Sequence, residues 1–80
     1  MRKSLHSDRS DALLDMLRGA RKRAGLTQVE VAQRLGRPQS FVAKYEGGER
    51  RLDVVELLEV AEALQADPVA MLRKLRNMSA

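Results

Sequence analysis

Three polar side chains that could recognise nucleic-acid bases lie close together in the chain: Gln39, Ser40 and Lys44. A glutamine amide can contact adenine through two hydrogen bonds, and a serine hydroxyl can donate or accept. A lysine can reach guanine acceptors or a phosphate. The alternative is that Gln39 and Ser40 are ordinary polar residues in the first turn of a helix. The side-chain types favour base reading in the major groove of a duplex.

The basic residues are concentrated in one segment, from Arg18 to Arg51, which contains nine basic and three acidic residues. The next segment, from Leu52 to Asp67, contains five acidic and no basic residues. A polyanion would be attracted to the first segment and repelled by the second. The alternative is a set of solvated helix faces. The candidate phosphate contacts among the cations are Lys22, Arg23, Arg37, Arg50 and Arg51.

The segment that must position these side chains runs from Leu26 to Gly48 and reads as two short helices joined by a turn. Thr27 and Glu30 have the spacing of a capping box, which begins the first helix. Gly36 suits the left-handed conformation that ends a helix, and Pro38 suits the first turn of the next one. The pattern predicts a helix-turn-helix over residues 27–47.

With these features the chain resembles the lambda-repressor-like (Cro type, or XRE) helix-turn-helix regulators over about residues 12–75. The resemblance implies a DNA-binding fold, and it implies that Gln28 contacts a phosphate together with the amides of a helix N-terminus. Arg37 departs from the family, where this position is commonly apolar. The matching residues are Leu26, Thr27, Gln28, Val31, Ala32, Leu35, Gly36, Gln39, Ser40, Val42, Tyr45, Glu46, Gly48, Leu57, Leu58, Ala61 and Leu64.

Three further helices are predicted around this motif. Ser7 or Ser10 can cap the first helix, which ends at Gly25, and residues 1–9 are expected to form a flexible arm. Asp53 is expected to cap the fourth helix, whose core side is predicted to comprise Val54, Leu57, Leu58, Ala61 and Leu64. Three glutamates of the same helix are expected to face solvent: Glu56, Glu59 and Glu62.

Asp67 and Pro68 give a strong start signal for a fifth helix, which is predicted to extend to about Asn77. Some of its apolar residues must close the core, and the others indicate a homodimer interface because no further chain covers them. A two-fold dimer would also place two reading helices about 34 Å apart on DNA. The candidate interface residues in the segment 67–78 are Val69, Met71, Leu72 and Leu75.

Two other residues in the motif have predicted contacts. Phe41 is expected to pack beneath the loop that precedes the fourth helix, although contact with a sugar or a thymine methyl is an alternative. Glu46 is expected to pair with a nearby arginine, such as Arg51 or Arg34, rather than to meet DNA.

The composition excludes several classes of protein. The chain has no cysteine and one histidine, His6, which lies in the predicted arm, so metal and catalytic sites are not expected. The start of the chain lacks the apolar segment of a signal peptide, and no apolar run is long enough to span a membrane. Two aromatic residues are too few for recognition of single strands by stacking.

We therefore predict an all-α protein: a compact five-helix lambda-repressor-like DNA-binding domain spanning residues 1–80. The expected function is a cytoplasmic, sequence-specific, double-stranded DNA-binding transcriptional regulator, nucleoid-associated when bound. It is expected to act as a homodimeric repressor on a pseudo-palindromic operator. No catalysis, cofactor, membrane or small-molecule ligand is expected. The alternative is an antitoxin-type protein-interaction module that also binds its own operator.

Overall fold

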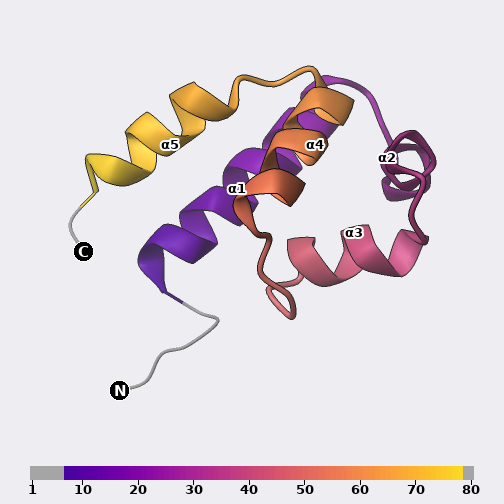
Figure 1. Ribbon diagram of the computed structural model, residues 1–80, viewed down its shortest axis with the longest axis horizontal. Helices are drawn as coiled ribbons and strands as arrows, with labels where there is room; N and C mark the ends of the chain where they lie inside the picture. The colour runs from indigo at the N-terminus through magenta and orange to yellow at the C-terminus, as the bar shows by residue number, and fades with distance from the viewer. Residues whose placement is uncertain (1–6, 79–80) are drawn as a thin grey trace.

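The computed structural model describes residues 7–78 and shows an all-α fold, as the sequence predicts (Figure 1). No strand occurs among these residues. The five helices are α1 (Asp8–Arg23), α2 (Gln28–Leu35), α3 (Gln39–Glu46), α4 (Val54–Leu64) and α5 (Pro68–Arg76).

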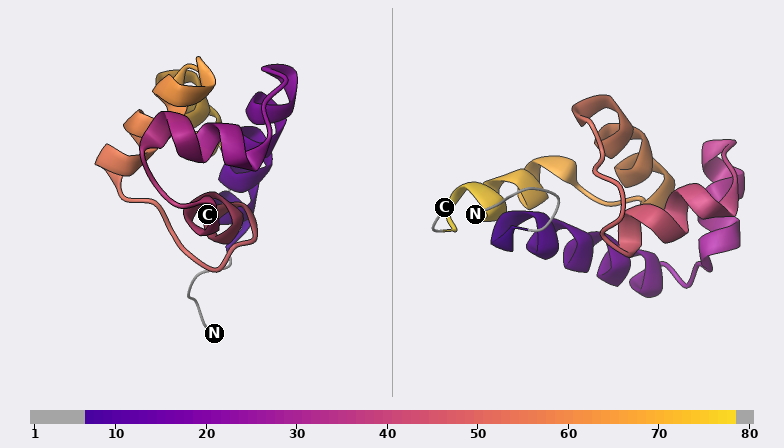
Figure 2. Two further views of the ribbon diagram at one scale, coloured as in Figure 1. Left: turned by 90° about the vertical axis from the view of Figure 1, so that its right-hand side faces the viewer. Right: turned by 90° about the horizontal axis from the view of Figure 1, so that it is seen from below.

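The long helix α1 organises the packing. It contacts α3, α4 and α5, while α2 packs on α3 and α4. Figures 1 and 2 show α5 beside α1 at one end of the molecule, with α2 and α3 together at the opposite end. The largest side chains that are fully buried in the core between these helices are Leu17, Val31, Val42, Tyr45 and Val60.

Local signals explain where the helices begin. Ser7 caps α1 by accepting a hydrogen bond from the Ser10 amide, and Thr27 and Glu30 form the predicted capping box at α2. Asp67 caps α5 through the amides of two following residues. Helix α1 therefore includes Asp8 and Arg9, which were predicted to belong to the flexible arm. The rest of that arm, including His6, lies outside the described residues.

Two helices end in a residue with left-handed backbone geometry. Gly36 ends α2 at φ 66°, a conformation that glycine adopts without strain because it has no Cβ. Gln65 ends α4 at φ 56°, a conformation that brings the Cβ of a residue other than glycine too close to the following carbonyl oxygen. Among the described residues Gln65 is the one residue other than glycine with positive φ, and no sequence signal indicated it.

The predicted core face of α4 is partly wrong. Val54 and Leu58 are exposed, with 71% of Val54 accessible, whereas Val60 is fully buried in their place. Glu56 is buried rather than solvent-facing, because its carboxylate completes the capping box with Asp53 and turns toward the loop before α4. Leu57, Ala61 and Leu64 are buried as predicted, so the core face keeps three of its five predicted residues.

Candidate nucleic-acid interface

Helix α3 presents different chemistry on its two faces. Phe41, Val42 and Tyr45 are buried against the other helices, and this apolar face anchors α3. The three predicted base-reading residues, Gln39, Ser40 and Lys44, are exposed. Pro38 precedes the helix as its N-cap, one residue earlier than the first-turn position expected for it. An anchored helix with an exposed polar edge has the arrangement that major-groove reading requires.

The first residues of α2 and α3 are joined through their side chains. Gln39 Nε2 donates to Gln28 Oε1 across 3.3 Å, and Gln28 Nε2 donates to Glu46 Oε1 across 3.1 Å. Glu46 at the end of α3 is 4% exposed, so the series of contacts starts from a fixed group. Gln28, the predicted phosphate contact, therefore also positions the side chain of Gln39.

Glu46 pairs with an arginine, as predicted, but its main partner is Arg21, with Arg18 at 3.9 Å, and not Arg51 or Arg34. Arg21 Nε and Nη2 donate to the two carboxylate oxygens across 2.7 and 3.0 Å, because the end of α3 faces back onto α1. The hydrogen bond to Glu46 is the main cause of a raised pKa of Arg21, partly opposed by desolvation. Arg34 instead donates to the carbonyl of Ala63 at the end of α4.

A second ion pair lies beside the turn of the motif. Arg50 donates to both oxygens of Glu56 across 2.9 and 2.7 Å, and Arg37 lies 3.5 Å from the same carboxylate. Both guanidinium groups also lie over the ring of Phe41, at 4.3 Å for Arg37 and 4.9 Å for Arg50. The hydrogen bond from Arg50 is the main cause of the low pKa of Glu56, about 2.

These contacts divide the predicted phosphate-binding cations into two groups. Arg37 and Arg50 lie over Phe41, which is buried as predicted, and they share the single negative charge of Glu56. The family departure at position 37 thus has a structural role. The remaining cations, Lys22, Arg23 and Arg51, have exposed side chains.

The predicted dimer residues on α5 differ in how far they are exposed. Val69 and Leu72 are 57% and 48% exposed, and Leu75 is half-buried. Met71 is only 7% exposed and belongs to the core of the single chain, so its assignment to a dimer interface is corrected. Helical spacing could not decide which apolar side of α5 faces inward. Further exposed apolar residues, not predicted for an interface, occur on α4: Val54, Val55 and Leu58.

Within residues 7–78 no cluster of side chains could hold a metal ion. In the same part of the chain, no helix has the length and apolar character needed to cross a membrane.

Comparison with known proteins finds a matching helix-turn-helix family and similar solved structures. A helix-turn-helix domain family matches residues 12–77. An XRE-family like protein from Pseudomonas syringae pv. tomato str. DC3000 is 54% identical, with a TM-score of 0.84, over 90% of this chain and 88% of that chain. The restriction-modification controller protein C.AhdI from Aeromonas hydrophila is 31% identical, with a TM-score of 0.71, over 78% and 94% of the two chains.

The structure of the controller protein C.Esp1396I tetramer with its natural 35 base-pair operator has the same fold, with a TM-score of 0.77. At 18% identity it covers 89% of this chain and 93% of that one. No curated protein sequence matches this chain. The family match over most of the chain, together with the geometry of α2 and α3, shows that the chain belongs to the XRE-type helix-turn-helix regulators.

Proposed function

We propose that this protein is a sequence-specific repressor that binds double-stranded DNA as a homodimer. The observation that carries the proposal is the exposed polar edge of α3, formed by Gln39, Ser40 and Lys44 on a helix whose other face is buried. These side chains can meet base edges only if the helix enters the major groove. Each two-point base contact would contribute about 1–3 kcal/mol of discrimination.

Non-specific attraction is assigned to the exposed cations. Lys22 and Arg51 are proposed to contact phosphates, and Gln28 is proposed to add its remaining N–H together with the amides at the start of α2. Arg37 and Arg50 act mainly by holding the turn and the loop around Phe41. Arg23 folds back along α1, since a Cβ added at Gly19 would lie 3.2 Å from its Nη1.

Dimerisation is proposed because one recognition helix reads too short a sequence for a unique site, and because α5 exposes Val69 and Leu72. Two copies related by a two-fold axis would read a pseudo-palindrome with half-sites about one helical turn apart. A bound dimer that overlaps a promoter would exclude the transcription machinery. Such a regulator would act in the cytoplasm, where the chromosome is accessible.

Selection of bound sites from a pool of random duplex DNA tests specificity, symmetry and spacing together. The wild-type protein is expected to enrich a two-fold symmetric sequence. The double variant Gln39→Ala/Lys44→Ala should keep its helical content and enrich no sequence. The matched control is Gln33→Ala/Lys74→Ala, which removes one amide and one cation from exposed positions outside α3. If the double variant enriches the wild-type sequence, the base-reading assignment is wrong.

The phosphate assignment has its own measurement, the dependence of DNA affinity on salt. The logarithm of the association constant should fall linearly with the logarithm of salt concentration, because counterions are released from the duplex. Lys22→Gln and Arg51→Gln should each reduce that slope by about 1 without changing the selected sequence. An unaltered slope in both variants would assign the attraction to other residues.

A further inference from the structure

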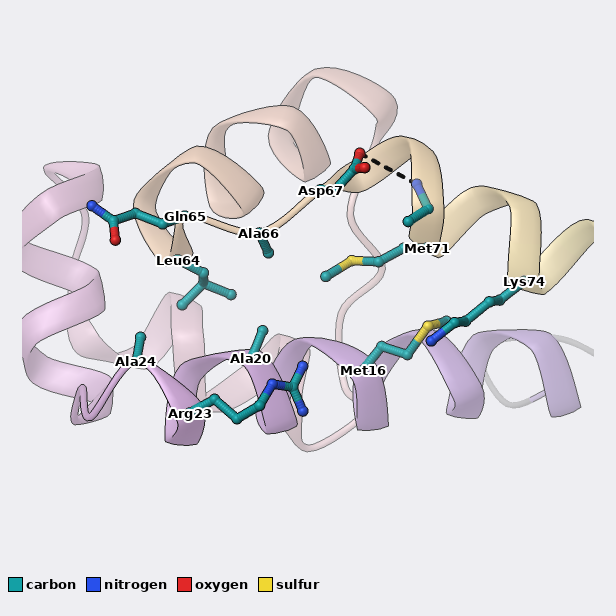
Figure 3. Close-up of a pocket in the computed structure, with 11 residues that line it drawn as sticks. Met16, Ala20, Arg23, Ala24, Leu64, Gln65, Ala66, Asp67, Met71 and Lys74 are labelled. Atoms are coloured by element: carbon teal, nitrogen blue, oxygen red, sulfur yellow. Dashed lines mark hydrogen bonds between the residues drawn. The ribbon is translucent and has the colours of Figure 1, made fainter.

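A pocket of about 380 Å³ lies where α1, the turn after α4 and the first half of α5 meet (Figure 3). Its size is at the lower end of the range for small-molecule sites. None of the three proposed base-reading residues lines it. The pocket therefore calls for an explanation other than DNA recognition.

Apolar and adaptable side chains form part of the pocket wall. Ala20 and Leu64 line it from α1 and α4, and Met16 and Met71 line it from α1 and α5. Figure 3 shows the two methionine side chains extending into the space between α1 and α5. Methionine has three rotatable bonds and a polarizable sulfur, so this surface can fit closely around a flexible aliphatic chain.

The rim of the pocket is cationic. Arg23 lies back along α1, and Lys74 reaches from α5 toward Met16 (Figure 3). Within residues 7–78, neither cation has a hydrogen bond or an ion pair. The acidic residue of the lining, Asp67, has its carboxylate turned to the amides of Val69 and Ala70, where it caps α5 across 2.9 and 3.3 Å. Arg23 and Lys74 thus place two positive charges, against the single negative charge of Asp67, next to the apolar part of the pocket wall.

The backbone at the rim fixes the shape of the pocket. Gln65 lines the pocket and is the residue whose left-handed conformation is strained. This conformation ends α4, and it is held by a hydrogen bond from the Ala66 amide to the Ala61 carbonyl across 2.9 Å. Here it turns the chain sharply between α4 and α5, which sets the separation of the walls that Leu64 and Met71 provide.

We propose that this pocket binds a small amphipathic monoanion, a carboxylate carried on a short aliphatic chain. The chain would lie between Met16 and Met71, and the carboxylate would pair with Arg23 and Lys74. This assignment goes beyond DNA binding and differs from the sequence-based expectation that the protein has no small-molecule ligand.

Methionine-selective NMR tests the proposal, with sodium octanoate as the probe, well below its micelle-forming concentration. The chain has four methionines, so methyl labelling gives four signals. Met16 and Met71 should shift and saturate together, whereas Met78, which does not line the pocket, should stay in place. A parallel titration with octan-1-ol, which has the same chain length without the charge, should shift the same methyl groups at least tenfold more weakly.

Charge variants identify the anion-binding groups. Lys74→Gln should weaken octanoate binding at least threefold, and Arg23→Gln/Lys74→Gln at least tenfold. Arg73→Gln, which removes a cation one residue away and outside the pocket, should leave binding unchanged. Ala70→Leu keeps both cations and fills the pocket, and it should abolish the shifts of Met16 and Met71.

Three results would overturn the proposal. Shifts of Met78 as large as those of Met16 would show detergent-like binding over the whole surface. Equal binding of octan-1-ol would show that the pocket does not select an anion. Unchanged methionine signals would show that octanoate does not enter. None of these measurements involves DNA, so each outcome is independent of the proposed repressor activity.

Discussion

The side-chain amide of Gln39 donates a hydrogen bond to the side-chain oxygen of Gln28 across 3.3 Å, which links the first residue of α3 to the first residue of α2. Glu46 determines the direction of this contact. An ionised carboxylate only accepts, so the nitrogen of Gln28 must face Glu46 and its oxygen must face Gln39. Gln39 keeps one N–H and its own oxygen available, and these are the two groups that adenine recognition requires.

Replacing Gln28 with alanine should therefore lower sequence discrimination although Gln39 is intact. The freed Gln39 side chain would have to be ordered on binding, and we expect about a tenfold loss in the ratio of operator affinity to random-DNA affinity, within the range of one base contact. Electrophoretic mobility-shift titrations with both duplexes measure this ratio. Gln33→Ala removes an exposed amide from the same helix and should preserve the ratio. An equal ratio for Gln28→Ala and wild type would assign no positioning role to Gln28.

Replacing Glu46 with alanine should destabilise the fold strongly. Its carboxylate is almost completely buried and is the main partner of Arg21, whose side chain is 13% exposed. Removing one member of a buried pair leaves the other charge uncompensated, and we expect a loss of about 3 kcal/mol in the free energy of unfolding. Urea denaturation measures it. Glu49→Ala, at an exposed position three residues later, should change stability by less than about 0.5 kcal/mol.

Acid should weaken the fold through Glu56. The pKa of this carboxyl group is about 2 in the folded protein, below its ordinary value of 4.5. Because the pKa is lowered by folding, the Glu56 carboxylate contributes fully to the stability of the fold above pH 4.5. This contribution is lost as the pH falls toward 2. Glu56→Gln should lower stability at neutral pH and flatten this part of the stability curve, measured by urea denaturation at a series of pH values. Glu59→Gln, exposed on the same helix, should retain the wild-type slope.

The parts of the fold that depend only on residues adjacent in the sequence could be predicted from the sequence. The capping box at Thr27, the cap at Asp53 and the left-handed end at Gly36 each follow from a few adjacent side chains, and the structure contains them all. The second half of the box at Asp53, formed by Glu56, was not predicted. The exposure of Gln39 and Lys44 also follows from helical spacing around the buried residues of α3.

What the sequence could not provide were the partners of charged groups across the fold. Three glutamates spaced along α4 look alike, yet only Glu56 meets Arg37 and Arg50, because the loop before α4 returns over Phe41. Met71 and Leu72 are adjacent and both apolar. Which of them is buried depends on how α5 lies against α1, and helical periodicity does not contain this information.

Relieving the strained backbone at Gln65 should stabilise the protein. Gln65→Gly removes the Cβ from a left-handed position, and the gain of ~1–2 kcal/mol is partly offset by the greater freedom of glycine in the unfolded chain. We expect a net stabilisation of about 0.5–1 kcal/mol in urea denaturation. The reciprocal variant Gly36→Gln places the same side chain at φ 66°, where no neighbouring atom would obstruct a Cβ, and should lower stability by a similar amount. A destabilising Gln65→Gly would mean that the Gln65 side chain contributes more than its backbone strain costs.

Introducing a charge at Leu72 should separate the proposed dimer into monomers. Leu72 is 48% exposed on α5, so Leu72→Glu can be solvated in a monomer, but it would be desolvated in a two-fold interface where it also meets its own copy. Analytical ultracentrifugation should show a fall from the dimeric to the monomeric mass, with unchanged helical content by circular dichroism. Val29→Glu places the same charge on α2 at a residue with 47% exposure and should leave the dimer intact. If Leu72→Glu stays dimeric, the exposed residues Val54, Val55 and Leu58 make α4 the next candidate interface, and Val55→Glu would be the decisive variant.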